Sequence, residues 1–439
     1  MAITSQQILD VLRSITDPDL NKDIVSLGFV KNIEIKGGDV SFDIELTTPA
    51  CPVKSEFQKK AEELVKSIHG VKKVDVRMTA QPMKQPTTTG EIQSTLKTVQ
   101  AVIAVSSCKG GVGKSTIAAH MALELASRGY KVGLMDADIH GPSVPTIFGL
   151  QGTPIYTNEQ KQIIPIEKNK LKLMSFGFLL GDAPAVMRGP IVSRYIQQIL
   201  HGTAWGDLDY LFIDMPPGTG DVQLTITQSV RLTGAVIITT RQTLSLVDVA
   251  RGILMFEQVN VPILGIIENM SYFMCDQCDK KHYIFGGSGQ SELSERFGVE
   301  TLAEIPLLPQ LMAKIEHPIA NSFIMDTVDH VIRALGKQRM TTNDAPTYRY
   351  DEKNVYLKWN NGPEMSIANR DLRLSCRCAL CVNELTGEKI LRERDLKSDI
   401  APTKIMSLGN YALAINWNDG HTSGIYPYKS IRELAGVGA

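Results

Sequence analysis

A glycine-rich loop directly after an apolar segment constrains the fold of this chain more than any other feature. The apolar run 101–105 precedes the loop Lys109-Gly110-Gly111-Val112-Gly113-Lys114-Ser115-Thr116. Such glycines let consecutive backbone N–H groups curl around phosphate oxygens, and the N-terminus of a following helix adds a favourable dipole. A helix is expected from the end of the loop to near Gly129. Strand, loop and helix in this order predict a phosphate-binding loop rather than a turn without a ligand.

Two side chains of this loop have the chemistry that a bound nucleotide requires. Lys114 is expected to neutralise the β- and γ-phosphates of ATP, and the Ser115 hydroxyl is expected to ligate Mg²⁺. Residues 110–116 together form the predicted nucleotide-binding segment. The common form of the motif has a glycine five residues before Gly113, where this chain has Cys108 with an additional lysine, Lys109, beside it.

Three aspartates follow two further apolar segments. Residues 132–135 lead into Asp136 and Asp138, and residues 212–213 lead into Asp214. The C-terminal ends of parallel strands face the crevice in which open α/β sheets bind ligands. We expect Asp214 to hold a water on the magnesium ion, Asp138 to orient the attacking water, and Asp136 to support the metal shell. One such aspartate is often only a helix cap, but three beside a phosphate loop favour a hydrolytic site.

Further apolar runs predict the fold around this site. Residues 210–213, 235–238 and 263–267 are continuously apolar, without the alternation of a half-exposed strand. Such runs are typical of strands that are covered on both faces. Together with the helical patterns between them, they predict an α/β domain over 99–336, with a mainly parallel sheet wrapped by helices.

Two smaller domains are expected on either side of the α/β domain. Residues 1–80 have the pattern of helix, hairpin, helix and strand, which predicts a small α+β domain. Residues 348–439 contain alternating segments that end in Asn361-Gly362 and Asp419-Gly420, and these hairpin signals predict a small β-rich domain. The polar stretches 81–98 and 337–347 are expected to be linkers.

The charge balance bears on the partners of the chain. It has 46 Lys and Arg against 47 Asp and Glu, a net charge of −1, which argues against an affinity built on many nucleic-acid phosphates. No apolar stretch approaches the ~18 residues that would cross a bilayer, and the first residues lack the features of a signal or transit peptide. We therefore expect no nucleic-acid or membrane partner. The expected location is the cytoplasm, or the plastid stroma for a mature form.

The cysteines favour metal binding, because five of the seven fall in two tight clusters. Cys275 and Cys278 form a Cys-x-x-Cys pair after a short predicted strand. One pair supplies two thiolates, whereas a zinc ion or a 4Fe–4S cluster usually takes four ligands. Two copies of the chain meeting on a twofold axis would supply four thiolates, and His282 would instead help to complete a zinc site within one chain. The spacing alone favours the two metals equally, and a reduced turn that faces solvent and binds no metal is the remaining alternative.

The second cluster places three thiols, Cys376, Cys378 and Cys381, within six residues. They predict either a zinc site or second iron–sulfur site, with Arg377 lowering the thiol pKa values, or a set of reduced structural cysteines. The sequence identifies no fourth ligand for them.

The remaining cysteines, Cys51 and Cys108, are isolated in the sequence. A lone cysteine is more often a small packed side chain than a ligand. Because Cys51 lies in a polar loop, an accessible thiol that hands over a metal centre is the alternative for this residue.

Longer strings around these features resemble a known family. Residues 109–116 resemble the deviant Walker A loop of the class that contains ParA, MinD and the nitrogenase iron protein. The strings 106–109 (SSCK), 136–143 (DADIHGPS), 187–190 (MRGP) and 214–221 (DMPPGTGD) resemble the Mrp/ApbC family of ATPases that carry iron–sulfur clusters. Residues 47–53 (TTPACPV) resemble a SufT-like domain, and the tail resembles a domain of unknown function. The three segments together resemble the three-domain form of the family in chloroplasts and bacteria.

The resemblance implies roles that the residue chemistry alone does not give. Lys109 would reach across a dimer to the nucleotide of the partner subunit, and Asn269 would contact adenine. The Cys275 and Cys278 pair would hold a 4Fe–4S cluster between two subunits. The family usually has proline after the first of these cysteines, and the negative charge of Asp276 in this chain is expected to lower the affinity or the potential of the cluster.

The resulting hypothesis is a homodimeric ATPase that holds a 4Fe–4S cluster and delivers it to apo iron–sulfur proteins. The alternative is a ParA- or MinD-like positioning or partition ATPase with structural zinc at its cysteines, and the charge-balanced end 430–439 counts against its membrane-bound version. The adjacent cysteine pair counts against a nitrogenase-like electron donor. Arg188 lies in one of the family strings, but a structural salt bridge explains it equally well.

Overall fold

The structure is a computed structural model of the chain. It describes residues 3–80, 96–180, 189–241, 245–275, 277–278, 280–284, 292–312, 315, 321–340, 345–359, 362–378, 380–382, 388–408, 411–422 and 424–436. By its internal contacts the chain divides into two compact units. One comprises Met1–Thr88 with Asp329–Met340, and the other comprises Thr89–Val328 with Thr341–Ala439.

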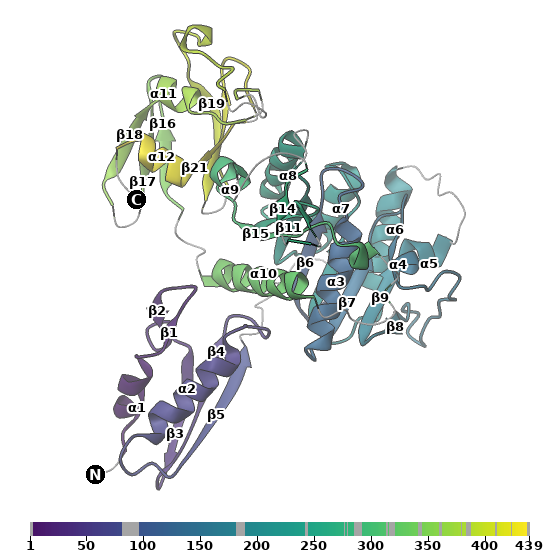
Figure 1. The fold of residues 1–439 in the computed structure, drawn as a ribbon, viewed down its shortest axis with the longest axis vertical. Helices are drawn as coiled ribbons and strands as arrows, with labels where there is room; N and C mark the ends of the chain where they lie inside the picture. Colours follow the sequence, from purple (N-terminus) through teal and green to yellow (C-terminus); the bar gives the residue numbers. More distant parts are fainter. Residues whose placement is uncertain are drawn as a thin grey trace. The chain divides into compact units, whose positions relative to one another are not determined.

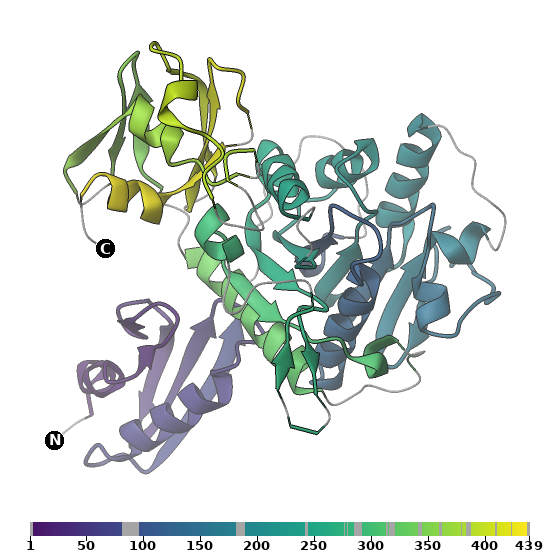
Figure 2. The ribbon, with the colours of Figure 1, turned by 45° about the horizontal axis from the view of Figure 1, so that its top comes forward.

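The first unit contains a three-stranded sheet with two helices packed on it (Figure 2). The first helix begins with a capping box between Thr4 and Gln7. The fourth strand alternates buried apolar with more exposed polar side chains, as a strand covered on one face does. The elements are α1 (Ser5–Leu12), β1 (Thr16–Asp17), β2 (Lys22–Asp23), β3 (Val30–Lys36), β4 (Asp39–Leu46), α2 (Lys54–Lys66) and β5 (Lys73–Ala80).

The second unit is built around an eight-stranded sheet in the order β15-β12-β11-β6-β10-β7-β9-β8. Every neighbouring pair is parallel except β8 and β9, so the mainly parallel sheet predicted from the sequence is confirmed. Its strands are β6 (Val99–Ser106), β7 (Val132–Asp136), β8 (Ile166–Lys168), β9 (Leu171–Ser175), β10 (Leu208–Asp214), β11 (Gly234–Thr239), β12 (Ile263–Glu268) and β15 (Thr301–Glu304).

Helices follow the strands and cover the sheet (Figure 1). The helix α3 packs against β6, β7 and β10, and α8 packs against β11. This covering explains why β11 and β12 are buried along their whole length. The helices are α3 (Lys114–Ser127), α4 (Val144–Ile147), α5 (Phe176–Leu180), α6 (Gly189–Gly202), α7 (Asp221–Ser229), α8 (Ser245–Gln258), α9 (Glu292–Phe297), η1 (Pro309–Met312) and α10 (Ser322–Met340), and the short hairpin consists of β13 (Phe273–Met274) and β14 (Lys281–His282).

The C-terminal segment forms two three-stranded antiparallel sheets, β16-β17-β18 and β19-β20-β21. Side chains from both sheets share one core, which also contains the three clustered cysteines. The β-rich character predicted for this segment is confirmed. Its elements are β16 (Thr347–Tyr350), β17 (Asn354–Lys358), β18 (Glu364–Ala368), α11 (Asn369–Leu374), η2 (Glu393–Asp395), β19 (Pro402–Leu408), β20 (Ala412–Trp417), β21 (Gly424–Pro427) and α12 (Tyr428–Leu434).

The polar segment 337–347, predicted to be a linker, differs from that prediction at its beginning. The helix α10 continues to Met340, so residues 337–340 are helical. Lys, Gln and Arg have good helix propensity despite their polarity. Within the first unit, Arg333 and Lys337 both face Asp19, at 3.8 and 3.9 Å. Most of the other predicted linker, 81–98, lies outside the described residues. None of the described helices is both long and apolar enough to cross a bilayer.

Candidate functional site

The glycine-rich loop connects β6 to α3, as the sequence predicts. Gly111 and Gly113 both have φ of 80°, a backbone conformation that L-residues with a side chain rarely adopt. Gly113 is the residue directly before α3. The Asn269 side chain lies so close to its Cα that a Cβ would not fit. The loop is therefore a curled backbone that ends at a helix N-terminus, which is the geometry that binds phosphate.

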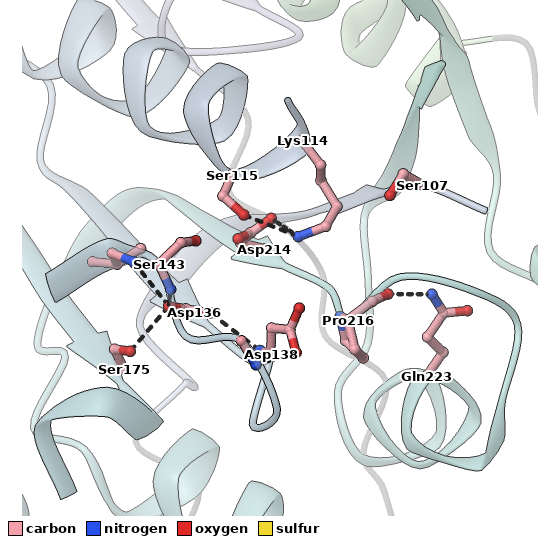
Figure 3. A network of polar contacts seen from close by, with 12 residues as sticks. Ser107, Lys114, Ser115, Asp136, Asp138, Ser143, Ser175, Asp214, Pro216 and Gln223 are labelled. Carbon is pink, nitrogen blue, oxygen red and sulfur yellow. Dashed lines mark hydrogen bonds and ion pairs between the residues drawn. The ribbon is translucent and has the colours of Figure 1, made fainter. Parts of the chain in front are cut away.

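Two acidic strand ends meet beside this loop because their strands are neighbours. Asp214 at the end of β10 pairs in register with Asp136 at the end of β7, and with Val105 of β6 on its other side. Lys114 forms an ion pair with Asp214 and also donates a hydrogen bond to the Ser115 hydroxyl at 3.3 Å (Figure 3). The side chain of Lys114 is 6% exposed and that of Asp214 is fully buried. The fold thus brings the predicted lysine, serine and two aspartates together.

Asp136 and Asp138 organise the loop after β7. Asp136 accepts hydrogen bonds from the backbone N–H groups of Ser143 (2.9 Å) and Val144 (3.0 Å) and from the Ser175 hydroxyl (3.0 Å). Asp138 is half-buried, and its Oδ1 atom accepts hydrogen bonds from the backbone N–H groups of His140 and Gly141 in the same loop. Asp136 therefore has a structural task in addition to the metal-shell role that its position suggests (Figure 3).

The site buries two carboxyl groups, those of Asp136 and Asp214, beside the ammonium group of Lys114. Burial, together with the nearby charge of Asp214, raises the pKa of Asp136 to about 7. Burial also raises the pKa of Asp214, although Lys114 opposes this shift. One carboxylate oxygen of Asp214 is buried without a hydrogen-bond partner. A divalent cation is the group that would satisfy this oxygen and favour the ionised form of both carboxylates.

Two further predicted nucleotide residues take part in hydrogen bonds to the backbone of the loop region. Lys109 is half-buried at its start, where its carbonyl accepts a hydrogen bond from Ser107 at 2.9 Å. Asn269 directly follows β12, and its side-chain amide donates to the carbonyl of Val112 at 2.9 Å. Asn269 therefore contacts the phosphate loop itself, whereas its predicted contact with adenine stays a prediction.

Cys275 and Cys278 lie on the short hairpin formed by β13 and β14. Cys278 is exposed and Cys275 is half-buried. The backbone N–H of Cys275 donates to Lys280 across the hairpin at 3.1 Å. Among the described residues, neither these cysteines nor His282 belongs to a group of three or more potential metal ligands. Asp276, between the two cysteines, lies outside the described residues.

The second cysteine cluster acquires a fourth ligand that the sequence analysis did not identify. His421, on the turn after β20, places its Nε2 atom 3.4 Å from Cys376 Sγ and 3.5 Å from Cys378 Sγ. The ligand atoms of Cys376, Cys378, Cys381 and His421 all lie within 4.8 Å of one another, and the four residues are buried. Three sulfurs and one imidazole in this arrangement are a donor set typical of structural zinc.

The basic residue beside these thiols is also different from the predicted one. Arg377, expected to lower the thiol pKa values, instead lies 3.6 Å from Glu295. Arg373 of α11 is the buried cation that donates to Cys381 Sγ, at 3.3 Å, and it is held by Asp419 at 2.9 Å. The two residues differ because α11 ends at Leu374, so Arg373 lies on the helix whereas Arg377 follows it in irregular backbone.

Among the described residues, neither isolated cysteine belongs to a group of three or more potential metal ligands. Burial raises the pKa of the Cys51 thiol to about 11, so the thiol stays protonated at neutral pH. This favours the interpretation of Cys51 as a packed side chain over that of an accessible thiol that hands over a metal centre. The sulfur of Cys108 lies against the backbone of Gly252, where a Cβ would come within 2.6 Å of it. Arg188 lies outside the described residues.

Fold and site together define a P-loop NTPase. The loop, the buried lysine and the paired strand-end aspartates are the parts that this class uses to bind a magnesium nucleotide. Comparison with family models assigns residues 98–335 to ParA, described as "NUBPL iron-transfer P-loop NTPase". The chain belongs to this family. Residues 5–77 match the iron-sulfur cluster assembly protein family, and residues 347–432 match the gamma-butyrobetaine hydroxylase-like N-terminal family.

Similar proteins extend over nearly the whole chain. It is 44% identical over 450 residues to the chloroplastic Fe-S cluster assembly factor HCF101 of Arabidopsis thaliana, covering 99% of this chain and 84% of the relative. It is 45% identical over 310 residues to an iron-sulfur cluster carrier protein of Synechocystis, covering 70% and 87%. A solved nucleotide-binding protein of Archaeoglobus fulgidus in complex with ADP is 37% identical, with a TM-score of 0.44, and covers 55% of this chain and 90% of that one. The predicted resemblance to the cluster-carrying ATPases, including their three-domain chloroplast form, is confirmed.

The raised pKa of Asp136 predicts how the stability of the nucleotide-free protein depends on pH. Because the folded state binds a proton more tightly than the unfolded state, this group's contribution to stability is present below about pH 4 and is lost as the pH rises through about 7. The loss is up to about 1.4 kcal/mol per pH unit. Melting temperatures between pH 5 and 8 should therefore fall more steeply with pH for the wild type than for Asp136→Asn.

Asp207→Asn is the matched control, because Asp207 is exposed just before the same strand, β10. It should keep the pH dependence of the wild type. Equal slopes for the wild type and Asp136→Asn would show that Asp136 is already ionised in the folded protein at low pH.

Proposed function

We propose that the protein is an ATP-dependent carrier that receives an iron–sulfur cluster at Cys275 and Cys278 and transfers it to apo iron–sulfur proteins. The observation that carries the proposal is the path of the chain after β12. Asn269 contacts the phosphate loop, and the thiol of Cys275 follows only six residues later on an exposed hairpin. The family membership and the relatives named as cluster carriers support this function over a partition or positioning ATPase.

The residues at the strand ends would bind and hydrolyse ATP. Lys114 would exchange its ion pair with Asp214 for the phosphates, which frees that carboxylate for a water on Mg²⁺. Ser115 would ligate the ion directly, and Asp138 would use its remaining carboxylate oxygen to orient the attacking water. Lys109 would complete the site of a partner subunit. Each of these groups acts by position and charge, which is most of what phosphoryl transfer requires.

Two copies of the chain are proposed to share the cargo. One hairpin offers two thiols, and a 4Fe–4S cluster takes four thiolates. A twofold axis through the cluster would bring together the same two cysteines from each copy. The exposure of Cys278 on a small hairpin favours such a contact between copies. The proposed location is the cytoplasm or the plastid stroma, and the name of the Arabidopsis relative, which is chloroplastic, agrees with the second of these.

Anaerobic reconstitution with iron and sulfide tests the cargo site. The wild type should develop the broad visible absorption of a cluster and bind about two iron atoms per chain, half of a shared 4Fe–4S cluster. The double variant Cys275→Ser/Cys278→Ser should lose most of the visible absorption and most of the bound iron, because serine is a poor ligand for the iron of such a cluster. Cys51→Ser is the control and should load like the wild type. Full loading of the double variant would contradict the proposal.

We also propose that Cys376, Cys378, Cys381 and His421 hold a single tetrahedral metal ion, with zinc as the best fit. Zinc bonds of about 2.3 Å to sulfur and about 2.0 Å to nitrogen place neighbouring ligand atoms about 3.5–3.8 Å apart. The sulfur–nitrogen separations of 3.4 and 3.5 Å match this spacing. A cubane holds its thiolates on four different iron atoms and spreads them further apart. The site would join α11 to the turn after β20 and so stabilise the C-terminal fold.

Metal analysis of the full chain, purified without added metal, tests this second site. The wild type should contain about one zinc ion per chain, and His421→Ala should contain much less, because three thiolates remain around an open position. Removal of zinc by a chelator should lower the melting temperature of the wild type more than that of His421→Ala. His282→Ala is the control and should retain the zinc. Undiminished zinc in His421→Ala would overturn this assignment.

A further inference from the structure

A set of ion pairs and ring contacts joins the nucleotide loop to the cysteine hairpin, and Arg241 lies at its centre. Arg241 follows β11, Glu268 ends β12, and Glu304 ends β15. These strands are neighbours in the sheet, so the three side chains meet at the same edge. Arg241 Nε donates to Glu268 at 2.6 Å, and its Nη2 donates to Glu304 at 2.7 Å. One guanidinium thus bridges two strand ends.

This bridge is well shielded from solvent. The side chains of Arg241, Glu268 and Glu304 are 9%, 3% and 18% exposed. An ion pair that is removed from water is screened much less than one at the surface, and a planar guanidinium fixes the direction of both bonds. Arg241 therefore adds a directional side-chain link between strand ends that the sheet already places side by side.

The bridge continues into the base of the hairpin. The guanidinium carbon of Arg241 lies 4.7 Å from the centre of the Tyr283 ring. Tyr283 follows β14 and packs on Tyr272, directly before β13, with ring centres 5.5 Å apart. The two tyrosines hold the two ends of the hairpin that contains Cys275 and Cys278. A cation within about 6 Å of an aromatic ring is attracted to it, so the hairpin base is held by Arg241.

The other end of the set reaches the phosphate loop. Asn269 is the residue next to Glu268, and its amide donates to Val112 of the loop at 2.9 Å. The following residue, Met270, has a φ of 51°, an uncommon conformation for a residue with a side chain. Ser271 then fixes the chain by donating to Ile305 at 2.9 Å from its backbone N–H. A displacement of the Asn269 backbone would therefore be passed directly to Glu268 on one side and toward the hairpin on the other.

We propose that Arg241 is a positioning residue that transmits the nucleotide state of the loop to the cysteine hairpin. The inference rests on the proposed function for the role of the cysteine pair, but the contacts that carry it do not involve a cluster. Nucleotide in the loop changes the partner of the Asn269 amide, and the adjacent Glu268 moves with the same backbone. Arg241 follows its carboxylate and alters the packing of Tyr283 at the hairpin base. The geometry of the two thiols then depends on the nucleotide.

Thiol alkylation of the metal-free full chain measures this coupling without a cluster. The rates at Cys275 and Cys278 are followed by mass spectrometry, with and without a non-hydrolysable ATP analogue and Mg²⁺. We expect the analogue to change the rate in the wild type by about fivefold, a size taken from the lower end of the affinity changes between coupled sites. Cys51, which lies in the other unit and has a raised thiol pKa, serves as the slowly reacting internal control and should give the same low rate in both conditions.

A pair of Tyr283 variants isolates the role of the arginine contact. Tyr283→Leu keeps an apolar side chain but removes the ring, whereas Tyr283→Phe keeps the ring. The nucleotide effect should fall below about twofold in Tyr283→Leu and should remain in Tyr283→Phe. Arg241→Lys keeps the charge but loses the two-pronged bridge and should behave like Tyr283→Leu. The affinity for a fluorescent ATP analogue, measured in parallel, should stay unchanged in both tyrosine variants.

The outcomes separate this inference from the proposed function. A nucleotide effect that persists in both Tyr283→Leu and Arg241→Lys would overturn the role of Arg241, and so would the absence of any effect in the wild type. Should Arg241→Lys fail to fold or bind nucleotide, the two tyrosine variants decide. A failure of cluster loading at the cysteines would leave the alkylation result intact.

Discussion

The buried ion pair between Lys114 and Asp214 is the interaction on which the nucleotide site depends. It exists because the loop after β6 and the end of β10 lie side by side in a parallel sheet. Removing one partner of such a pair typically costs about 3–5 kcal/mol, since a charge is left buried and alone. The pair also leaves the site incomplete, because Asp136 is a second buried carboxyl beside it and the second oxygen of Asp214 has no hydrogen-bond partner. A magnesium nucleotide supplies both the cation and an alternative partner for the lysine.

The two proposed metal sites differ in burial and in the number of ligands, and these differences match the retention of metal at one site and its release from the other. The four ligands near α11 are buried, come from two separated segments and are supported by Arg373 and Asp419, as a structural ion requires. The cysteine pair of the hairpin is partly exposed and offers too few ligands on its own. A site that must release its cargo benefits from exposure and from an incomplete ligand set. The contrast favours retention of metal at the first site and transfer from the second.

The sequence predicts the central site well because its signals are local. Lys114 lies in a contiguous motif, and Asp136 and Asp214 directly end apolar strands whose parallel pairing brings them together. His421 could not be found in this way, because it is 45 residues from Cys376 and only the packing of two sheets brings it near. Whether Arg373 or Arg377 lies beside the clustered thiols depends on where the short helix α11 ends, and composition does not determine that position. The bridge by Arg241 likewise depends on strand order, which periodicity leaves open.

Two chains are proposed to share one cluster through the Cys275 and Cys278 pairs. Native mass spectrometry of the anaerobically loaded protein tests it most directly, because it counts chains and cluster atoms in the same particle. A shared cluster predicts a species of two chains with one 4Fe–4S unit bound between them, which disappears when both cysteines are replaced by serine. A loaded single chain that carries a complete 4Fe–4S cluster would contradict it.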